Sequence, residues 1–179
     1  SDVVPGTYFD FNGTDDYVVS ANNTNISGAN PRSLCVWCYP TELESGRFYS
    51  AVKIGDNSSD AKLFEILIRN NSGDHQVTAH FSGDGQTFSS SSGKTMLNNY
   101  NFIVMTYSGS VVSVYVDGVL KGSQSFTLNT TNTQLNVGLK TFNLHYDFKG
   151  RESVIHLYNR ELTAAEVEQN FNALKGRYQ

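Results

Sequence analysis

The feature that most limits the fold of this chain is a two-residue alternation of apolar and polar side chains, repeated in many short runs. Such alternation predicts half-buried β-strands, because successive side chains of a strand point to opposite faces of a sheet. Clusters of Gly, Asn, Ser and Asp between the runs indicate turns, and many short strands with frequent turns predict an antiparallel sandwich or barrel. Strands are expected at residues 33–39, 47–54, 62–69, 75–82, 100–107, 111–117, 124–128, 134–138 and 150–158.

Two β-hairpins are predicted from the turn residues. Strands at 7–11 and 17–19 flank the connector NGTDD, which has the length of a hairpin turn. Asp117-Gly118 joins two apolar runs, and both residue types tolerate the positive φ angles of a type I′ turn. Residues 88–95 (FSSSSGKT) have no apolar alternation and are expected to form a small polar loop.

One helix is predicted near the C-terminus, from about residue 164 to residue 175. Thr163 and Glu166 have the spacing of a capping box, in which each side chain binds a backbone amide that the helix leaves unpaired. Lys175 and Gly176 would end the helix with a favourable charge and a residue that can adopt a left-handed conformation. We expect the helix to lie on the sandwich through an apolar stripe made of Val167, Phe171 and Leu174.

The two cysteines form a C-x-x-C pattern, which in other contexts indicates a redox or zinc site. Here Cys35 and Cys38 lie within a predicted strand, where residues three apart point to opposite faces and are too far apart for a disulfide. Leu34, Val36 and Cys38 should therefore face one side of the strand, and Trp37 the other. Both cysteines are interpreted as unpaired, buried thiols.

Length, charge and composition exclude several classes of protein. With 179 residues, the chain is predicted to form a single domain over residues 1–179. Its net charge of −4 argues against nucleic-acid binding. No run approaches the roughly 18 consecutive apolar residues of a membrane span, so no membrane insertion is expected. The aromatic content of 12% excludes intrinsic disorder.

The residue patterns of known active sites are incomplete in this sequence. Glu65 has no second carboxylate beside it on its strand, and Asp147 and Glu152 would lie on opposite faces of a regular strand. The GKT tripeptide at 93–95 resembles the end of a phosphate-binding loop, but Phe88 occupies the position of the required first glycine. The chain is therefore predicted not to be an enzyme.

Several motifs, spread over nearly the whole chain, are similar to those of one known family. The opening segment FDFNGTDDYV, the strand with Val36 and Trp37, and the hairpin YNFIVMTYSGSVVSVYVDG each resemble motifs of the laminin-G-like, concanavalin A-like family. So do the closing strands at 128–138 and the corner YNREL before the helix. The resemblance implies an all-β fold, an antiparallel two-sheet jelly-roll sandwich with one short C-terminal helix.

Calcium is the one cofactor that the sequence suggests. Asp10, Asp15 and Asp16 lie close together near one turn, and carboxylate oxygens are the ligands that calcium prefers. The alternative is that these aspartates simply form the turn. Ser108 and Ser153 occupy two positions where the family often has an acidic residue, which argues against a calcium site.

The tail at 166–178 is similar to laminin-G-like domains that end structural proteins of tailed bacteriophages. The prediction is a non-enzymatic binding module located in a virion, as a capsid-decorating or fibre component that contacts other virion proteins or the host surface through protein–protein contacts, to which glycan contacts can be added. An N-terminus without a secretion signal and the unpaired cysteines favour it. The alternative is a carbohydrate-binding, lectin-type module of a secreted or cell-surface protein. Binding is expected in the rim loops, through Asp84, Gln86, His145 and Tyr146.

Overall fold

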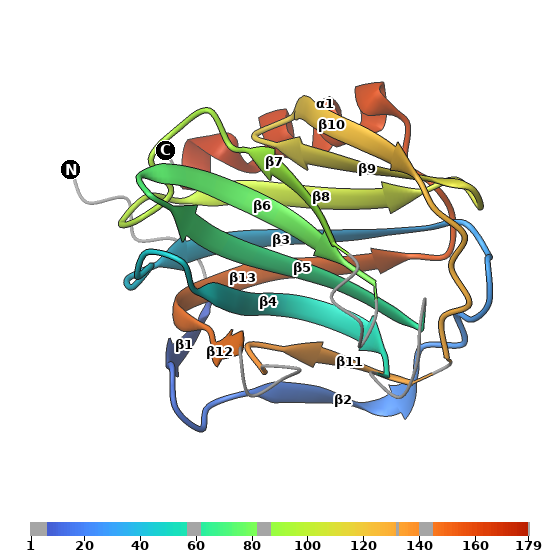
Figure 1. The fold of residues 1–179 in the computed structure, drawn as a ribbon, viewed down its shortest axis with the longest axis horizontal. Helices are drawn as coiled ribbons and strands as arrows, with labels where there is room; N and C mark the ends of the chain where they lie inside the picture. The colour runs from blue at the N-terminus through green and yellow to red at the C-terminus, as the bar shows by residue number, and fades with distance from the viewer. Residues whose placement is uncertain (1–6, 57–61, 82–86, 132, 140–144, 179) are drawn as a thin grey trace.

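The computed structural model describes residues 7–56, 62–81, 87–131, 133–139 and 145–178, which form two β-sheets packed face to face (Figure 1). The six-stranded sheet has the order β1-β13-β3-β8-β9-β10. Its strands are β1 (Phe9–Asn12), β3 (Arg32–Pro40), β8 (Asn101–Tyr107), β9 (Val111–Val116), β10 (Val119–Ser125) and β13 (Lys149–Tyr158).

The seven-stranded sheet has the order β2-β11-β4-β5-β6-β7, with the short β12 beside β4. Its strands are β2 (Val18–Asn23), β4 (Phe48–Gly55), β5 (Leu63–Asn71), β6 (Asp74–His80), β7 (Thr87–Ser91), β11 (Gln134–Val137) and β12 (His145–Asp147). Neighbouring strands pair in antiparallel fashion, except that β12 runs parallel to β4. The predicted two-sheet antiparallel sandwich with a C-terminal helix is confirmed.

The central strand β3 shows how the alternation builds two apolar layers. Leu34, Val36 and Cys38 belong to the core between the sheets. Cys35 and Trp37 belong to a second cluster on the outer face of the six-stranded sheet, as expected. Both cysteines are free and buried, and burial raises the pKa of Cys35 to about 12 and that of Cys38 well above its usual value. These thiols are therefore poor nucleophiles.

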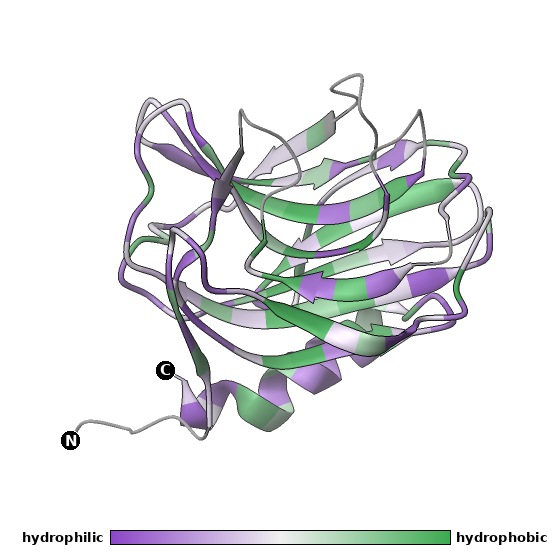
Figure 2. Ribbon diagram, turned by 90° about the horizontal axis from the view of Figure 1, so that it is seen from below, coloured by the Kyte–Doolittle hydropathy of each residue, from purple (hydrophilic) through white to green (hydrophobic). Residues whose placement is uncertain are grey.

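Helix α1 (Ala164–Leu174) covers this second cluster and lies along the outer face of the six-stranded sheet (Figure 2). Thr163 and Glu166 form the predicted capping box. Val167 is fully buried, and the ring of Phe171 stacks on Trp37 with centroids 5.8 Å apart. No helix in the described ranges is long and apolar enough to cross a membrane.

The helix ends close to the predicted residue 175, but the predicted left-handed cap at Gly176 is wrong. Gly176 does not adopt a left-handed conformation, because the chain tightens instead into a 3-10 turn, η1 (Lys175–Arg177). This turn places Tyr178 against Trp37, with ring centroids 4.5 Å apart, and the Ser153 hydroxyl donates a hydrogen bond of 3.1 Å to the Tyr178 hydroxyl. The chain tail is thus part of the outer apolar cluster.

One predicted hairpin is confirmed and the other is wrong. Asp117 and Gly118 have φ angles of 51° and 80°, and they join β9 to β10 as expected. In contrast, β1 pairs with β13 and β2 pairs with β11, so the connector NGTDD passes from one sheet to the other. The Asn12 side chain shapes this connector by accepting hydrogen bonds from the amides of Thr14 and Asp15.

Two further segments differ from the prediction. The serine-rich segment contains the edge strand β7, which pairs with β6. Its serines bind across the sheet: Ser89 lies 2.7 Å from the Thr78 hydroxyl, and Ser91 donates to Asp74 at 2.6 Å. Hydrogen bonds therefore take the place of the apolar alternation that the sequence lacks. The strand expected at 124–128 begins earlier, as β10, and ends at Ser125.

Candidate functional site

A network of buried polar side chains lies on the outer face of the seven-stranded sheet. Register places Glu65 of β5 between Lys53 of β4 and His80 of β6. One Glu65 oxygen accepts a hydrogen bond of 2.6 Å from Ser50, and the other lies 2.7 Å from Nδ1 of His80. Asp147 of β12 is paired with Ser50 and so lies on the same face. These five side chains are between 0% and 7% exposed.

The electrostatics of the network favour an ionised Glu65. Burial alone would raise the pKa of this carboxyl, but the hydrogen bonds from His80 and Ser50 and the charge of Lys53 outweigh it, and the pKa lies below its usual value. Burial lowers the pKa of Lys53, while the charges of Glu65 and Asp147 act in the opposite direction. The arrangement is a compensated set of charges rather than an isolated buried ion, which would be far more costly.

The network lies at the end of the sheet from which two chain connections depart. The β4–β5 connection leaves after Gly55, and the β6–β7 connection leaves after His80, and the register places both at this end. Helix α1 covers the opposite sheet, and no described helix or strand covers this face. The outer face of the seven-stranded sheet therefore combines a polar floor with two loop connections at one end.

The structure tests the predicted rim residues only in part. Asp84 and Gln86 belong to the β6–β7 connection and lie outside the described residues. His145 is the first residue of β12, and its side chain is also outside the described part. Tyr146 has a structural role: its ring packs against Tyr49 with centroids 5.6 Å apart, and the Arg47 guanidinium lies 4.3 Å from its centroid.

The three aspartates suggested for calcium do not come together as a metal site. Asp15 accepts a hydrogen bond from the Asn12 side chain, and Asp16 accepts one from the Asn12 backbone amide. Asp10 lies earlier, within β1, where it is paired with Arg151, and its carboxylate is 4.0 Å from the Arg151 Nε. Among the described residues, no group of three or more His, Cys, Asp or Glu side chains could hold a metal ion. The carboxylates serve turn formation and surface charge.

The partners of Glu65 cannot be identified from the sequence around it, since they come from other strands. His80 is 15 residues away in the chain, and Asp147 lies in a strand near the C-terminus. Asp147 and Glu152 were expected on opposite faces of one strand. They lie in different sheets instead, so they do not form a catalytic pair. A local signal did exist. Lys53 and Glu65 are charged residues within largely apolar stretches of β4 and β5, and buried charges of this kind need partners.

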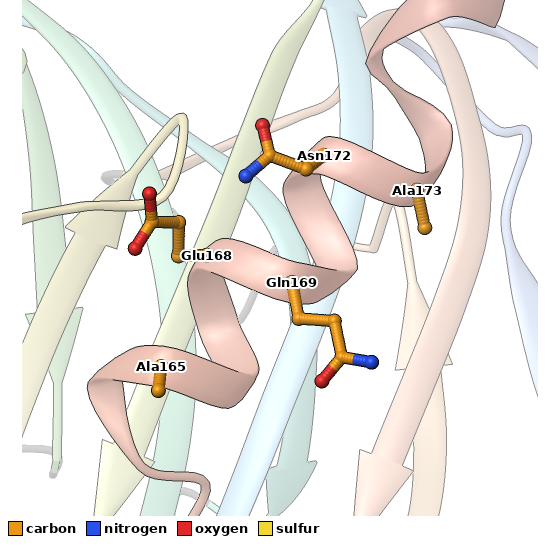
Figure 3. A pocket seen from close by; sticks show the side chains of 5 residues that line it. All are labelled: Ala165, Glu168, Gln169, Asn172 and Ala173. Atoms are coloured by element: carbon orange, nitrogen blue, oxygen red, sulfur yellow. The ribbon is translucent and has the colours of Figure 1, made fainter.

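A shallow depression on the solvent-facing side of α1 is the other surface feature of note (Figure 3). It is formed by one helix alone and offers no cluster of chemically active groups. Its lining is small or polar and consists of Ala165, Glu168, Gln169, Asn172 and Ala173. We do not interpret this depression as a second binding site, and its exposed residues are suitable for control substitutions.

A family model described as the concanavalin A-like lectin/glucanases superfamily, of laminin G type, matches residues 12–168. The chain belongs to this superfamily. Its concanavalin A-like sandwich also resembles solved structures. One is a heptameric SAP-like pentraxin from Limulus polyphemus, with 13% identity and a TM-score of 0.75, covering 94% of this chain and 82% of that chain. Comparison with curated protein sequences gives no match.

Two other similar structures contain bound sugars. The ligand binding domain of botulinum neurotoxin serotype D, in complex with N-acetylneuraminic acid, has 16% identity and a TM-score of 0.63 over 88% of this chain and 40% of that chain. Domain 4 of the extracellular arabinanase AbnA from Geobacillus stearothermophilus, in complex with arabinotriose, has 17% identity and a TM-score of 0.63 over 92% of this chain and 81% of that chain. At these identities the likeness establishes the jelly-roll fold.

Proposed function

We propose that this concanavalin A-like domain is a non-enzymatic glycan-binding module, and that it binds sugar at the end of the seven-stranded sheet that carries the polar network. The observation that carries the proposal is the set of hydrogen-bonded groups around Glu65, buried on the outer face of the seven-stranded sheet, on the side of the sandwich opposite to α1. A rigid polar floor of this kind holds the adjacent strand ends in place, which limits the entropy lost when loops bind a ligand.

The chemistry of the surrounding residues suits sugar hydroxyls. Asn136, half-buried on β11, is paired with Lys53, and Thr78 lies two residues from His80 on the same face of β6. Amides and hydroxyls both donate and accept hydrogen bonds, as sugar hydroxyls do. The superfamily description includes lectins, and the neurotoxin and arabinanase domains are recorded with N-acetylneuraminic acid and arabinotriose. These relationships support a glycan as the ligand.

The carboxyl groups argue against glycoside hydrolysis. The general acid of a glycosidase must hold its proton near neutral pH, which requires a raised pKa. The pKa of Glu65 is lowered instead. Burial raises the pKa of Glu152 strongly, but its side chain is 0% exposed and belongs to the other sheet. Glu65 and Glu152 therefore do not form the pair of general acid and nucleophile that glycoside hydrolysis requires.

The test is a screen of the purified chain against an array of neutral and acidic oligosaccharides, followed by calorimetry with the best binder. Asp147→Asn removes one charge from the network, and binding should weaken by about tenfold, or 1.4 kcal/mol. Gln169→Ala and Asn172→Ala, on the exposed side of α1, are matched controls that should bind as the unmodified chain does. Loss of binding in the helix variants alone, no binding to any glycan, or release of sugar from a polysaccharide would each contradict the proposal.

The location in a virion is a separate part of this proposal. It is supported by the similarity of residues 166–178 to the ends of phage structural domains. A virion protein that binds host polysaccharide would use the same glycan site. A mass-spectrometric inventory of purified virions should contain the chain. Its detection as a secreted or cell-surface protein would favour the lectin-type alternative.

A further inference from the structure

The N-terminal strand β1 offers a free backbone edge. It is the first strand of the six-stranded sheet, and among the described strands it pairs with β13 alone. The backbone amide of Asn12 donates to the Asp16 carboxylate rather than to β13. Since backbone groups of a strand alternate in direction, the amide of Asp10 lies on the same free side. An edge of this kind can accept a further strand from another chain.

One side of this edge borders an apolar groove between the two sheets. The Phe9 side chain lies on the same, inward face of β1 as that of Phe11, but 49% of its surface is exposed. The groove has a volume of about 360 Å³ and is formed by β1, β2, β11 and β13. Its apolar walls include Phe9, Val18, Leu135, Val137 and Ile155. A half-exposed phenylalanine beside an apolar groove is a place where a partner's apolar side chain gains by burial.

The other side of the edge is acidic. Asp10 points outward and 66% of its side chain is exposed, with Arg151 at 4.0 Å. Asp15 and Asp16 lie three and four residues after the end of the strand and are also exposed. The Arg151 guanidinium also lies 4.9 Å from the centroid of the Tyr8 ring and 5.7 Å from that of Tyr39. Lys149, opposite Asn12, is paired with Glu42 at 2.8 Å. Asp10, Asp15 and Asp16 therefore outnumber the remaining cation, Arg151, and leave this side negative, which favours a basic partner.

Two of the other sheet edges, β10 and β7, lack this combination. Strand β10 exposes Val119 and Leu120, but a register shift between Leu120 and Gly122, together with Lys121, interrupts its edge. Such bulges and lysines are typical devices against pairing with other chains. Strand β7 presents mainly serine side chains. The apolar groove and the acidic outer side therefore occur together at β1.

We propose that β1 is a peptide-docking edge, which binds an extended segment of a partner protein with alternating apolar and basic side chains. The segment pairs with the backbone at Asp10, its apolar side chains enter the groove beside Phe9, and its basic side chains face Asp10. Backbone pairing supplies affinity, and the two different sides of the edge supply specificity. This interaction is independent of the proposed glycan site, which lies on the outer face of the other sheet.

The test uses a synthetic peptide with blocked ends and alternating valine and lysine residues, with a valine and glutamate peptide for comparison. The lysine peptide should bind at least about tenfold more tightly. Two further lysine peptides carry N-methyl groups on alternate residues, in the two possible phases. Only one phase blocks the amides that face β1, so one methylated peptide should lose binding and the other should keep it. Equal binding of both would indicate plain charge attraction and overturn the proposal.

Variants of the chain locate the binding edge. Asp10→Pro removes the free amide and the charge without touching the β13 side, and Phe9→Ala removes one wall of the groove, so each should weaken peptide binding by about tenfold or more. Leu120→Ala, at the far edge of the same sheet, is the control and should leave binding unchanged. Thermal unfolding of each variant verifies the fold. Self-association of the chain that Asp10→Pro abolishes would show that a second copy occupies the edge, and the proposal would be wrong.

Discussion

At the residue scale, the unusual side chain is Glu152. It is 0% exposed, and neither carboxyl oxygen has a hydrogen-bond partner among the described residues. Register places it opposite both Phe9 and Cys38, on the side of β13 that faces the sandwich interior. Burial raises its pKa well above the usual value, because the low-dielectric interior disfavours the charged form of the carboxyl group. Its two unpaired oxygens still cost free energy.

This predicts a pH-dependent effect of Glu152→Gln. Because the folded pKa lies above the unfolded pKa of about 4.5, stability is retained below pH 4.5 and falls as the pH rises above it. The unmodified chain should lose about 1.4 kcal/mol per pH unit relative to the variant, until the folded pKa is reached. Urea unfolding of both proteins between pH 4 and pH 8 measures the difference. A difference that does not change with pH would mean that Glu152 is ionised in the folded protein.

At the scale of elements, the C-terminal segment acts as one unit. The capping box starts α1 in a defined place, Val167 and Phe171 attach it to the sheet, and the 3-10 turn after it directs Tyr178 back onto Trp37. Tyr178 is 7% exposed and also approaches Tyr100, with centroids 5.0 Å apart. The last residues of the chain therefore close the aromatic cluster that the helix begins to cover.

We expect Tyr178→Ala to destabilise the protein by about 3 kcal/mol, because it removes a buried aromatic ring and leaves a cavity beside Trp37. Tyr178→Phe keeps the ring and loses only the hydrogen bond from Ser153, which should cost about 1 kcal/mol. Chemical unfolding monitored by the fluorescence of Trp37 measures both. An equal loss for the two variants would show that the hydroxyl, rather than the ring, holds the tail in place.

At the scale of the whole molecule, the six-stranded sheet separates two apolar layers. Cys38 lies in the layer between the sheets, and Cys35 lies in the layer under α1. Two cysteines three residues apart thus report on different parts of the structure. Opening the outer layer requires only that α1 detach, whereas opening the inner layer requires that the sheets separate, so the two events need not have the same free energy.

Thiol labelling should resolve the two events. In single-cysteine variants, made with Cys38→Ala or Cys35→Ala, the remaining Cys35 should react faster than the remaining Cys38. Thr163→Ala removes the helix cap, at a cost of about 1 kcal/mol, and should accelerate labelling of Cys35 more than labelling of Cys38. Thr163→Ser keeps the cap and serves as the control. Equal acceleration at both thiols would indicate that the helix detaches only when the whole domain unfolds.

Local interactions explain what the sequence alone determined. The alternation of side chains fixed which face of β3 is inward, Asp117-Gly118 specified a turn with positive φ angles, and Thr163 with Glu166 set the helix start. Each of these depends on residues within a few positions of one another. The tertiary structure decided the pairing of β1 with β13, the strand character of the serine-rich β7 and the network of Glu65 with His80 and Asp147. In each case the stabilising partner lies on another strand, and the sequence of one strand does not specify which strand will lie beside it.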